Sequence, residues 1–218
     1  MDTIFNKLLE VPWYTWLVLA LLFGASVALI QGSKRFKWNS RRVSMAAMSL
    51  AIAFVLSCIR LFRMPQGGTI TPASMLPIIL FLTAYGTLPA FAVGFAYGLL
   101  QLLTDPLVIH PVQLLLDYPF AYAAMALGGL ALLLPEDKKF RLPLAVLLGY
   151  FGRFVMAVLS GAIFFAEYAG EQNAWIYSVV YNISYIGWDA LICALIAFVP
   201  GWNRVTDLMR DKEALPKP

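Results

Sequence analysis

Asp117, Arg153 and Asp189 are ionisable residues that lie inside strongly apolar stretches of this 218-residue sequence. A charge in the hydrocarbon of a membrane is costly, so such residues usually face protein or a water-filled cavity and often mark function. His110, Gln113 and Asp117 follow one another at i, i+3 and i+7, which places them on one helix face. Two interpretations of Asp117 remain open: a counter-charge for a bound cation, or an ion pair with Arg153.

The last apolar stretch carries a second group of polar residues. Ser178, Asn182, Tyr185 and Asp189 recur at intervals of four, three and four residues, which forms a polar stripe along one helix. Tyr177 and Tyr181 lie beside it. Aromatic faces attract cations, more strongly where water is excluded. The two groups together favour a site for a flat, polar, cationic small molecule.

The composition requires these residues to be positioned by membrane helices. The chain is 61% hydrophobic and 13% charged, with a mean hydropathy of +0.77. A spanning helix needs about 20 apolar residues. We expect an all-α polytopic membrane protein with apolar segments at 12–31, 43–62, 74–85, 88–104, 111–134, 142–166 and 175–200. The segment 74–85 is too short to cross alone and has Pro72 and Pro77 near its start, so it should be tilted, broken or re-entrant.

The distribution of Lys and Arg predicts the orientation. Twelve of the sixteen lie in the loop 32–42, near 135–141 or in the C-terminal tail, and cytoplasmic loops carry such an excess. Seven crossings with the N-terminus outside and the C-terminus in the cytoplasm satisfy this rule. The loops 63–73 and 167–174 then lie outside, and Asp117 lies near the extracellular surface. The net charge of +4 needs no nucleic-acid partner.

Several functions are excluded by what the sequence lacks. It has no G-x-x-x-x-G-K-[ST] phosphate loop, no nucleophile motif and no cluster of metal ligands, and it contains one histidine. Cys58 and Cys193 lie in apolar segments, where buried thiols are expected. We therefore predict no enzyme, no catalytic residue, no bound metal and no cofactor. Uphill transport would draw energy from an ion gradient or from another subunit.

Four segments together resemble one known family. They are MPQGGTIT (64–71), HPVQLLLDYPFAYAAMALGG (110–129), SGAIFF (160–165) and WIYSVVYN (175–182). In this order and spacing they resemble the thiamin-specific S component of energy-coupling factor transporters. The resemblance covers about residues 43–200. It implies a six-helix substrate-binding membrane domain at 43–200, preceded by an extra transmembrane helix and basic loop (1–42) and followed by a cytoplasmic tail (201–218).

The resemblance also implies roles for particular residues. The implied thiamin-binding residues are Asp117, Tyr118, Gly161, Phe165, Tyr177 and Asn182, with Gln66, Gly67 and Gly68 in a lid formed by the first outer loop. Ala47 and Ala51 would contact a transmembrane coupling subunit, which two cytoplasmic ATPases would drive. Ala157 replaces a histidine frequent in the family. Additional pocket residues are expected at His110, Gln113, Tyr181, Tyr185 and Asp189.

The leading hypothesis is therefore a subunit that captures thiamin from the extracellular side of the cell membrane, without chemical change of the ligand. Because Ala157 removes a ring contact, an S component for a thiamin precursor or a related vitamin is the first alternative. A solitary ion-coupled carrier, with Asp117 or Asp189 carrying protons, is the second. Small residues at Ala90, Gly94 and Gly98 should allow close packing of helices within the chain.

Overall fold

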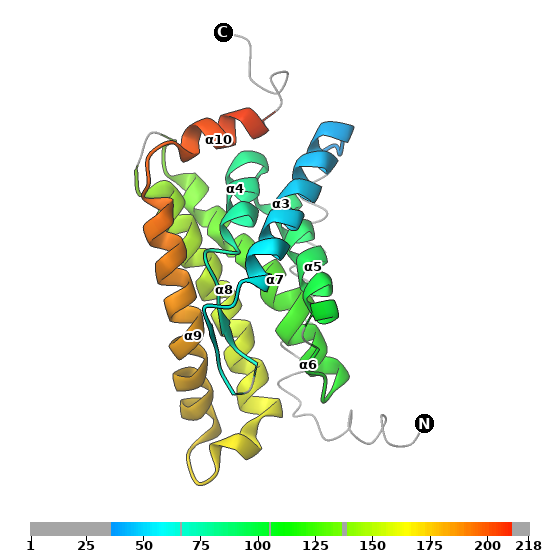
Figure 1. Cartoon of the computed structure of the whole chain (residues 1–218), viewed down its shortest axis with the longest axis vertical. Helices are drawn as coiled ribbons and strands as arrows, with labels where there is room; N and C mark the ends of the chain where they lie inside the picture. Colours follow the sequence, from blue (N-terminus) through cyan, green and yellow to red (C-terminus); the bar gives the residue numbers. More distant parts are fainter. Residues whose placement is uncertain (1–35, 66, 105, 137–138, 211–218) are drawn as a thin grey trace.

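The computed structural model describes residues 36–65, 67–104, 106–136 and 139–210, and it contains a bundle of apolar helices (Figure 1). Within the described residues, five segments are long and apolar enough to span a membrane: α3 (Ser40–Cys58), α5 (Thr87–Thr104), the segment Pro111–Leu133, α8 (Arg141–Phe164) and α9 (Ala174–Ala197). The shorter helix α4 (Leu76–Tyr85) completes the set. This confirms the predicted all-α membrane fold. The expected helix at 12–31 lies outside the described residues.

The short helix α4 is preceded by a segment that is not helical. The sequence predicts a helix over 43–62, but α3 ends at Cys58 and the backbone at Ile59 is extended. A small antiparallel hairpin follows, in which β1 (Phe62–Arg63) pairs with β2 (Thr69–Ile70). α4 then begins with Pro77 in its first turn, where a missing N–H does no harm. Loop 59–75 and α4 together therefore replace one full-length membrane helix.

The segment Pro111–Leu133 changes helix type along its length. It consists of α6 (Pro111–Leu115), the π-helical turn η1 (Leu116–Phe120), α7 (Ala121–Ala123) and the 3₁₀ segment η2 (Ala124–Leu133). Pro119 lies inside η1, and proline cannot donate the hydrogen bond of a regular α-helix. Single π turns within helices are frequent at functional sites. Here the wide turn contains Asp117 and Tyr118.

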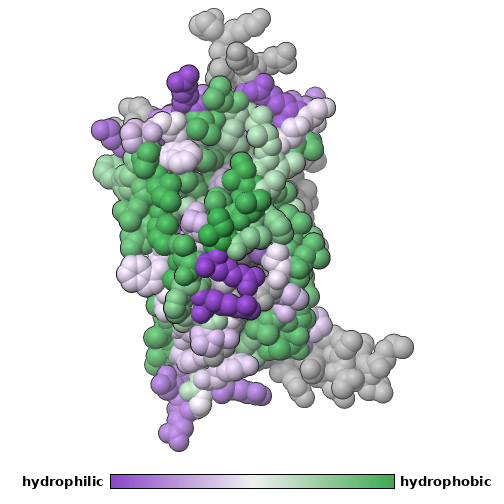
Figure 2. Space-filling view, viewed as in Figure 1, coloured by the Kyte–Doolittle hydropathy of each residue, from purple (hydrophilic) through white to green (hydrophobic). Residues whose placement is uncertain are grey.

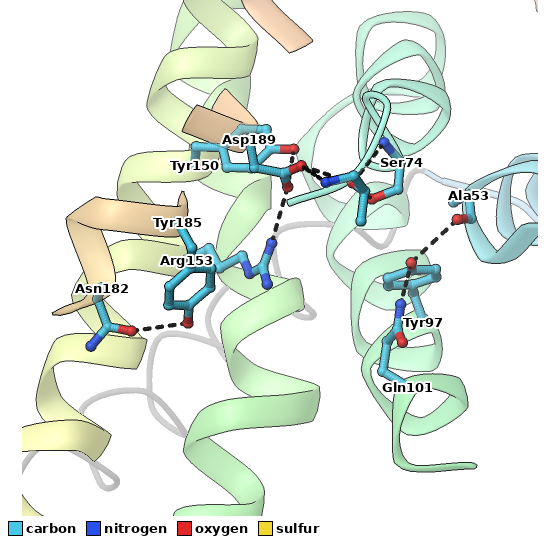
Figure 3. Close-up of polar contacts among 10 residues, drawn as sticks. Ala53, Ser74, Tyr97, Gln101, Tyr150, Arg153, Asn182, Tyr185 and Asp189 are labelled. Carbon is cyan, nitrogen blue, oxygen red and sulfur yellow. Dashed lines mark hydrogen bonds and ion pairs between the residues drawn. The ribbon is translucent and has the colours of Figure 1, made fainter. Parts of the chain in front are cut away.

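Glycines allow the helices to approach one another closely. A Cβ built on Gly94 would lie 2.4 Å from the carbonyl oxygen of Tyr122, and one on Gly152 would lie 2.3 Å from that of Ala124. Such distances admit no side chain. The small-residue series on α5 therefore packs within the chain, as its spacing predicts. Nearby, Tyr97 Oη donates to the carbonyl of Ala53 at 3.3 Å and links α5 to α3 (Figure 3).

The basic segments gather at one end of the bundle. Arg210, at the end of α10 (Trp202–Met209), forms an ion pair of 2.6 Å with Glu136, and Arg41 donates to the carbonyl of Leu208 at 2.8 Å. The short helix η3 (Ala166–Ala169) and the loop into α9 lie at the opposite end (Figure 1). An apolar belt separates the two polar ends on the face drawn in Figure 2, which agrees with a multi-pass membrane protein.

Candidate functional site

A cavity of about 540 Å³ lies among loop 59–75, η1, α8 and α9. Figure 2 shows a hydrophilic patch within the apolar belt, on the face where the β-hairpin lies in Figure 1. Twelve of the residues predicted to bind the ligand or to belong to its pocket line the cavity: Gly67, Gly68, Gln113, Asp117, Tyr118, Gly161, Phe165, Tyr177, Tyr181, Asn182, Tyr185 and Asp189. Residues distant in the chain therefore meet around one space.

The remaining candidates lie elsewhere. His110 does not line the cavity: its Nδ1 accepts from the N–H of Val112 at 3.1 Å, and its ring stacks on Phe164. It occupies the N-cap position because Pro111 begins the helix. Ala47 and Ala51 are exposed on the outer surface of α3, away from the cavity lining. Gln66 lies outside the described residues.

Asp117 is held in place by the helix that carries it. Gln113 Nε2 donates to Asp117 Oδ2 at 2.6 Å and to the carbonyl of Leu107 at 2.9 Å, while Gln113 Oε1 accepts from the N–H of Ile109 at 3.1 Å. Gln113 is buried, so these bonds satisfy its amide. Within the described part of the chain, Asp117 forms no ion pair with Arg153. Its carboxylate is therefore oriented by an amide and is not neutralised by that cation.

The stripe on α9 forms one wall of the cavity. Tyr185 Oη donates to Asn182 Oδ1 at 2.9 Å, and Asn182 Nδ2 donates to the carbonyl of Ser178 at 2.9 Å. The rings of Tyr177 and Tyr181 lie nearly parallel, with centroids 6.1 Å apart, and Tyr185 meets Tyr181 edge to face. This wall presents aromatic faces, which bind planar rings and cations.

Loop 59–75 closes another side of the cavity. A Cβ built on Gly68 would lie 2.7 Å from the ring of Tyr185, so only glycine permits this approach. The N–H of Gly68 donates to Tyr181 Oη at 3.4 Å. Gly67 adopts a positive φ of 93° within the hairpin turn. The loop therefore rests directly on the tyrosines of α9.

The buried partner of Arg153 is Asp189. Arg153 Nη1 lies 3.6 Å from Asp189 Oδ2, and Tyr150 Oη donates to the same oxygen at 2.8 Å (Figure 3). Both the N–H and the hydroxyl of Thr71 donate to Asp189 Oδ1 at 2.8 Å. Arg153 also lies over the ring of Tyr122, 4.7 Å from its centroid. The sequence leaves open an ion pair of Arg153 with Asp117; the structure instead pairs Arg153 of α8 with Asp189 of α9.

Some lining residues were not found from the sequence. Thr71, Ser74 and Tyr122 line the cavity, but single hydroxyl-bearing residues in a loop or an apolar helix carry no recognisable pattern. Ala157 faces the cavity one helical turn before Gly161. In the sequence, Ala157 matches a position that often bears a histidine in the family, and a residue at such a position is expected to face the cavity.

An apolar helical bundle that encloses a cavity of carboxylates, amides and tyrosines defines a polytopic membrane protein with a binding site for a small polar solute. The family model described as "Thiamine transporter protein" matches residues 43–206. The chain therefore belongs to the thiamine transporter family, which confirms the resemblance seen in the sequence. This is a family of transporters and not of enzymes.

Individual relatives agree with this assignment. The chain is 34% identical over 169 residues to the thiamine transporter ThiT of Bacillus subtilis, covering 72% of this chain and 87% of the relative. It is 26% identical over 139 residues to ThiT of Lacticaseibacillus paracasei, covering 57% and 67%. The solved structure of ThiT from Listeria monocytogenes has a TM-score of 0.56 at 20% identity, covering 77% and 92%, and so shares the fold.

Proposed function

We propose that this protein binds thiamin in the cavity beside Asp117 and is the substrate-binding subunit of an energy-coupling factor transporter. Thiamin joins an aminopyrimidine to a quaternary thiazolium, so it is planar in two parts and permanently cationic. A cavity of about 540 Å³ is in the usual range for sites that enclose small ligands. Binding and release are the whole of its chemistry.

One observation carries this proposal. Asp117 lines the cavity opposite a wall of tyrosines and is oriented by Gln113 instead of being paired with Arg153. Asp117 is partly buried; withdrawing a carboxylate from water without a partner cation is costly, and a cationic ligand would offset that cost. Tyr177, Tyr181 and Tyr185 supply the aromatic faces that attract a cation.

The remaining lining residues receive roles in the same proposal. Asn182 and Tyr118 hydrogen-bond polar groups of the ligand, and Phe165 packs on a ring. Gly161 allows α9 to pack close to α8, since a Cβ at this position would lie 2.3 Å from Ser178 Oγ. It also leaves space for the ligand. Gly67, Gly68 and Gln66 belong to the covering loop. This assignment is supported by the meeting of the described residues among them at one cavity.

The proposal includes partner subunits. The sequence has no phosphate loop, so energy must come from elsewhere, and we assign it to two cytoplasmic ATPases acting through a transmembrane coupling subunit. The exposed face of α3 carries Ala47 and Ala51 between the large apolar residues Val43, Met48 and Val55, which are all more than half exposed. Small residues on such a face permit close approach of a partner helix.

The orientation follows from charge. Arg41, Arg210 and Arg141 lie at one end of the bundle, and the positive-inside rule places that end in the cytoplasm. The cavity beside loop 59–75 then opens toward the exterior. The N-terminus lies outside and the C-terminus inside. We assign binding to residues 43–200, with 1–42 and 201–218 as flanking segments.

Isothermal titration of the purified full-length chain tests the ligand. Thiamin, its isolated aminopyrimidine half and its isolated thiazolium half are titrated in parallel. Thiamin should bind most tightly, because both rings contact the cavity. Tighter binding of the pyrimidine half would instead favour a precursor transporter, which the small side chain of Ala157 leaves room for.

Reconstituted vesicles test the mode of transport. Vesicles with this chain alone should bind thiamin without accumulating it, and vesicles with the coupling subunit and both ATPases should accumulate it when ATP is present. Accumulation by the chain alone under a proton gradient would replace the proposal with that of a solitary carrier.

A further inference from the structure

Asp189 is one of the most buried polar residues of the described chain, with 1% of its side chain exposed. Oδ1 accepts two hydrogen bonds from Thr71, and Oδ2 accepts one from Tyr150 and pairs with Arg153. Four donors from loop 59–75 and α8 therefore converge on one carboxylate of α9. A residue so fully occupied has little capacity to bind a ligand itself.

Arg153 lines the cavity next to this carboxylate. It lines the cavity on the same face of α8 as Ala157 and Gly161, at intervals of one helical turn, and its side chain is 12% exposed. A guanidinium stays protonated in proteins. The site proposed for a cation therefore contains a permanent positive charge in its wall.

The charges of the cavity decide whether a cation is attracted. Asp117 and Arg153 would cancel if they were alone. Asp189, paired with Arg153, leaves one net negative charge among these three residues. Arg60 and Arg63 also line the space, but both are exposed, and solvent and salt screen exposed charges far more than buried ones.

We propose that Asp189 makes the cavity selective for a cation by neutralising Arg153, without touching the ligand. This inference rests on the proposed function, because it concerns how the same cavity recognises its ligand. It adds a specificity-determining residue whose oxygens are already occupied by protein donors.

The same carboxylate fixes the covering loop. Thr71 is bonded to it through two groups, and Ser74 Oγ lies 2.7 Å from Thr71 Oγ1. Between them Ala73 has a φ of 59°, a conformation that non-glycine residues rarely adopt. Strained backbone persists where surrounding contacts determine it. Asp189 therefore joins the charge balance of the cavity to the position of loop 59–75.

The test compares thiamin with a neutral isostere in which carbon replaces the thiazolium nitrogen. Asp189→Asn keeps the shape and an acceptor for Thr71 but removes the charge. We expect the affinity for thiamin to fall about tenfold or more, and the affinity for the neutral isostere to change much less. Thr71→Val is the matched control, because it loosens the loop and keeps both charges, and it should affect the two ligands equally.

A second variant keeps the test decisive if Asp189→Asn fails to fold. Arg153→Met combined with Asp189→Asn removes both members of the ion pair, and buried ion pairs can be replaced by apolar groups of similar volume. Its ratio of thiamin affinity to isostere affinity should match that of the wild type. A double variant without cation preference would overturn the inference.

The remaining outcomes separate the two proposals. If the wild-type chain binds thiamin and Asp189→Asn weakens both ligands by the same factor, Asp189 is a structural anchor and this inference fails alone. If Asp189→Asn keeps the full affinity for thiamin, this inference also fails alone, because the charge of Asp189 is then not needed for binding. If the wild-type chain binds neither ligand, the proposed function fails and this inference fails with it.

Discussion

Gly98 on α5 lies directly against the backbone of Tyr118 in the π-helical turn η1. A Cβ built on Gly98 would stand 2.4 Å from the carbonyl oxygen of Tyr118 and 2.6 Å from the Cα of Pro119. These are backbone atoms, which cannot rotate away as a side chain can. The position of Asp117, in the same turn, is therefore set by a glycine that does not itself line the cavity.

Substitution of that glycine should disturb binding from a distance. Gly98→Ala must push α5 and η1 apart, and overpacking of this kind costs about 1–3 kcal/mol. We expect a lower unfolding temperature in detergent and weaker thiamin binding. Gly187→Ala on α9 is the control, because its Cβ would meet only Ile183 at 3.6 Å, an ordinary contact. Unchanged stability of Gly98→Ala would show that α5 is free to move.

The exposed face of α3 predicts a separation of binding from transport. Ala51→Trp adds a large ring to the face assigned to the coupling subunit and touches no residue of the cavity lining. We expect thiamin binding to persist while copurification with the coupling subunit and ATP-driven uptake are lost. Val180→Trp, on an exposed position of α9, is the matched control and should leave both intact. Loss of binding in Ala51→Trp would place α3 within the site instead.

The basic end of the bundle predicts a modest pH dependence of stability. The hydrogen bonds from Arg210, and to a smaller extent the contact with Arg141, lower the pKa of Glu136 from 4.5 to about 2. A lowered folded-state pKa stabilises the protein fully above the unfolded value and loses that effect as pH falls toward 2. Because Glu136 is exposed, the pair contributes at most about 1 kcal/mol.

Thermal unfolding of the purified chain between pH 5 and 2 checks this contribution. The unfolding temperature of Glu136→Gln should fall less steeply over that pH range than that of the wild type. The exposed Asp207→Asn is the control, since its contact with Arg210 is longer, at 3.7 Å. Equal slopes for the wild type and Glu136→Gln would contradict the ion-pair assignment.

Hydropathy was sufficient to predict the membrane helices, because each needs a long apolar run. The break near residues 74–85 was also predictable, since Pro72 and Pro77 border a run too short to cross. The end of α3 was not. Residues 59–62 are largely apolar, so they continue the helical pattern, but the chain leaves the helix there and forms β1 at Phe62–Arg63, which pairs with Thr69 and Ile70.

The site could be predicted as a set of residues but not as a set of contacts. Arg153 is equally distant in sequence from Asp117 and Asp189, so spacing could not decide which carboxylate it pairs with. The structure pairs it with Asp189, whereas Asp117 accepts a hydrogen bond from Gln113. Thr71 and Ser74 act through loop geometry, which leaves no periodic signal. His110 shares a face with Asp117 but serves as a helix cap.

Calorimetric titration of thiamin into the wild type, Asp117→Asn and Glu171→Gln measures what the carboxylate of Asp117 contributes to ligand binding. Asp117→Asn removes the cavity charge and keeps the side chain's shape, whereas Glu171→Gln removes the same charge from an exposed loop. We expect tight binding by the wild type and Glu171→Gln, and a loss of about 2 kcal/mol or more in Asp117→Asn, which is about thirtyfold in affinity. Equal affinities for all three proteins would contradict this expectation.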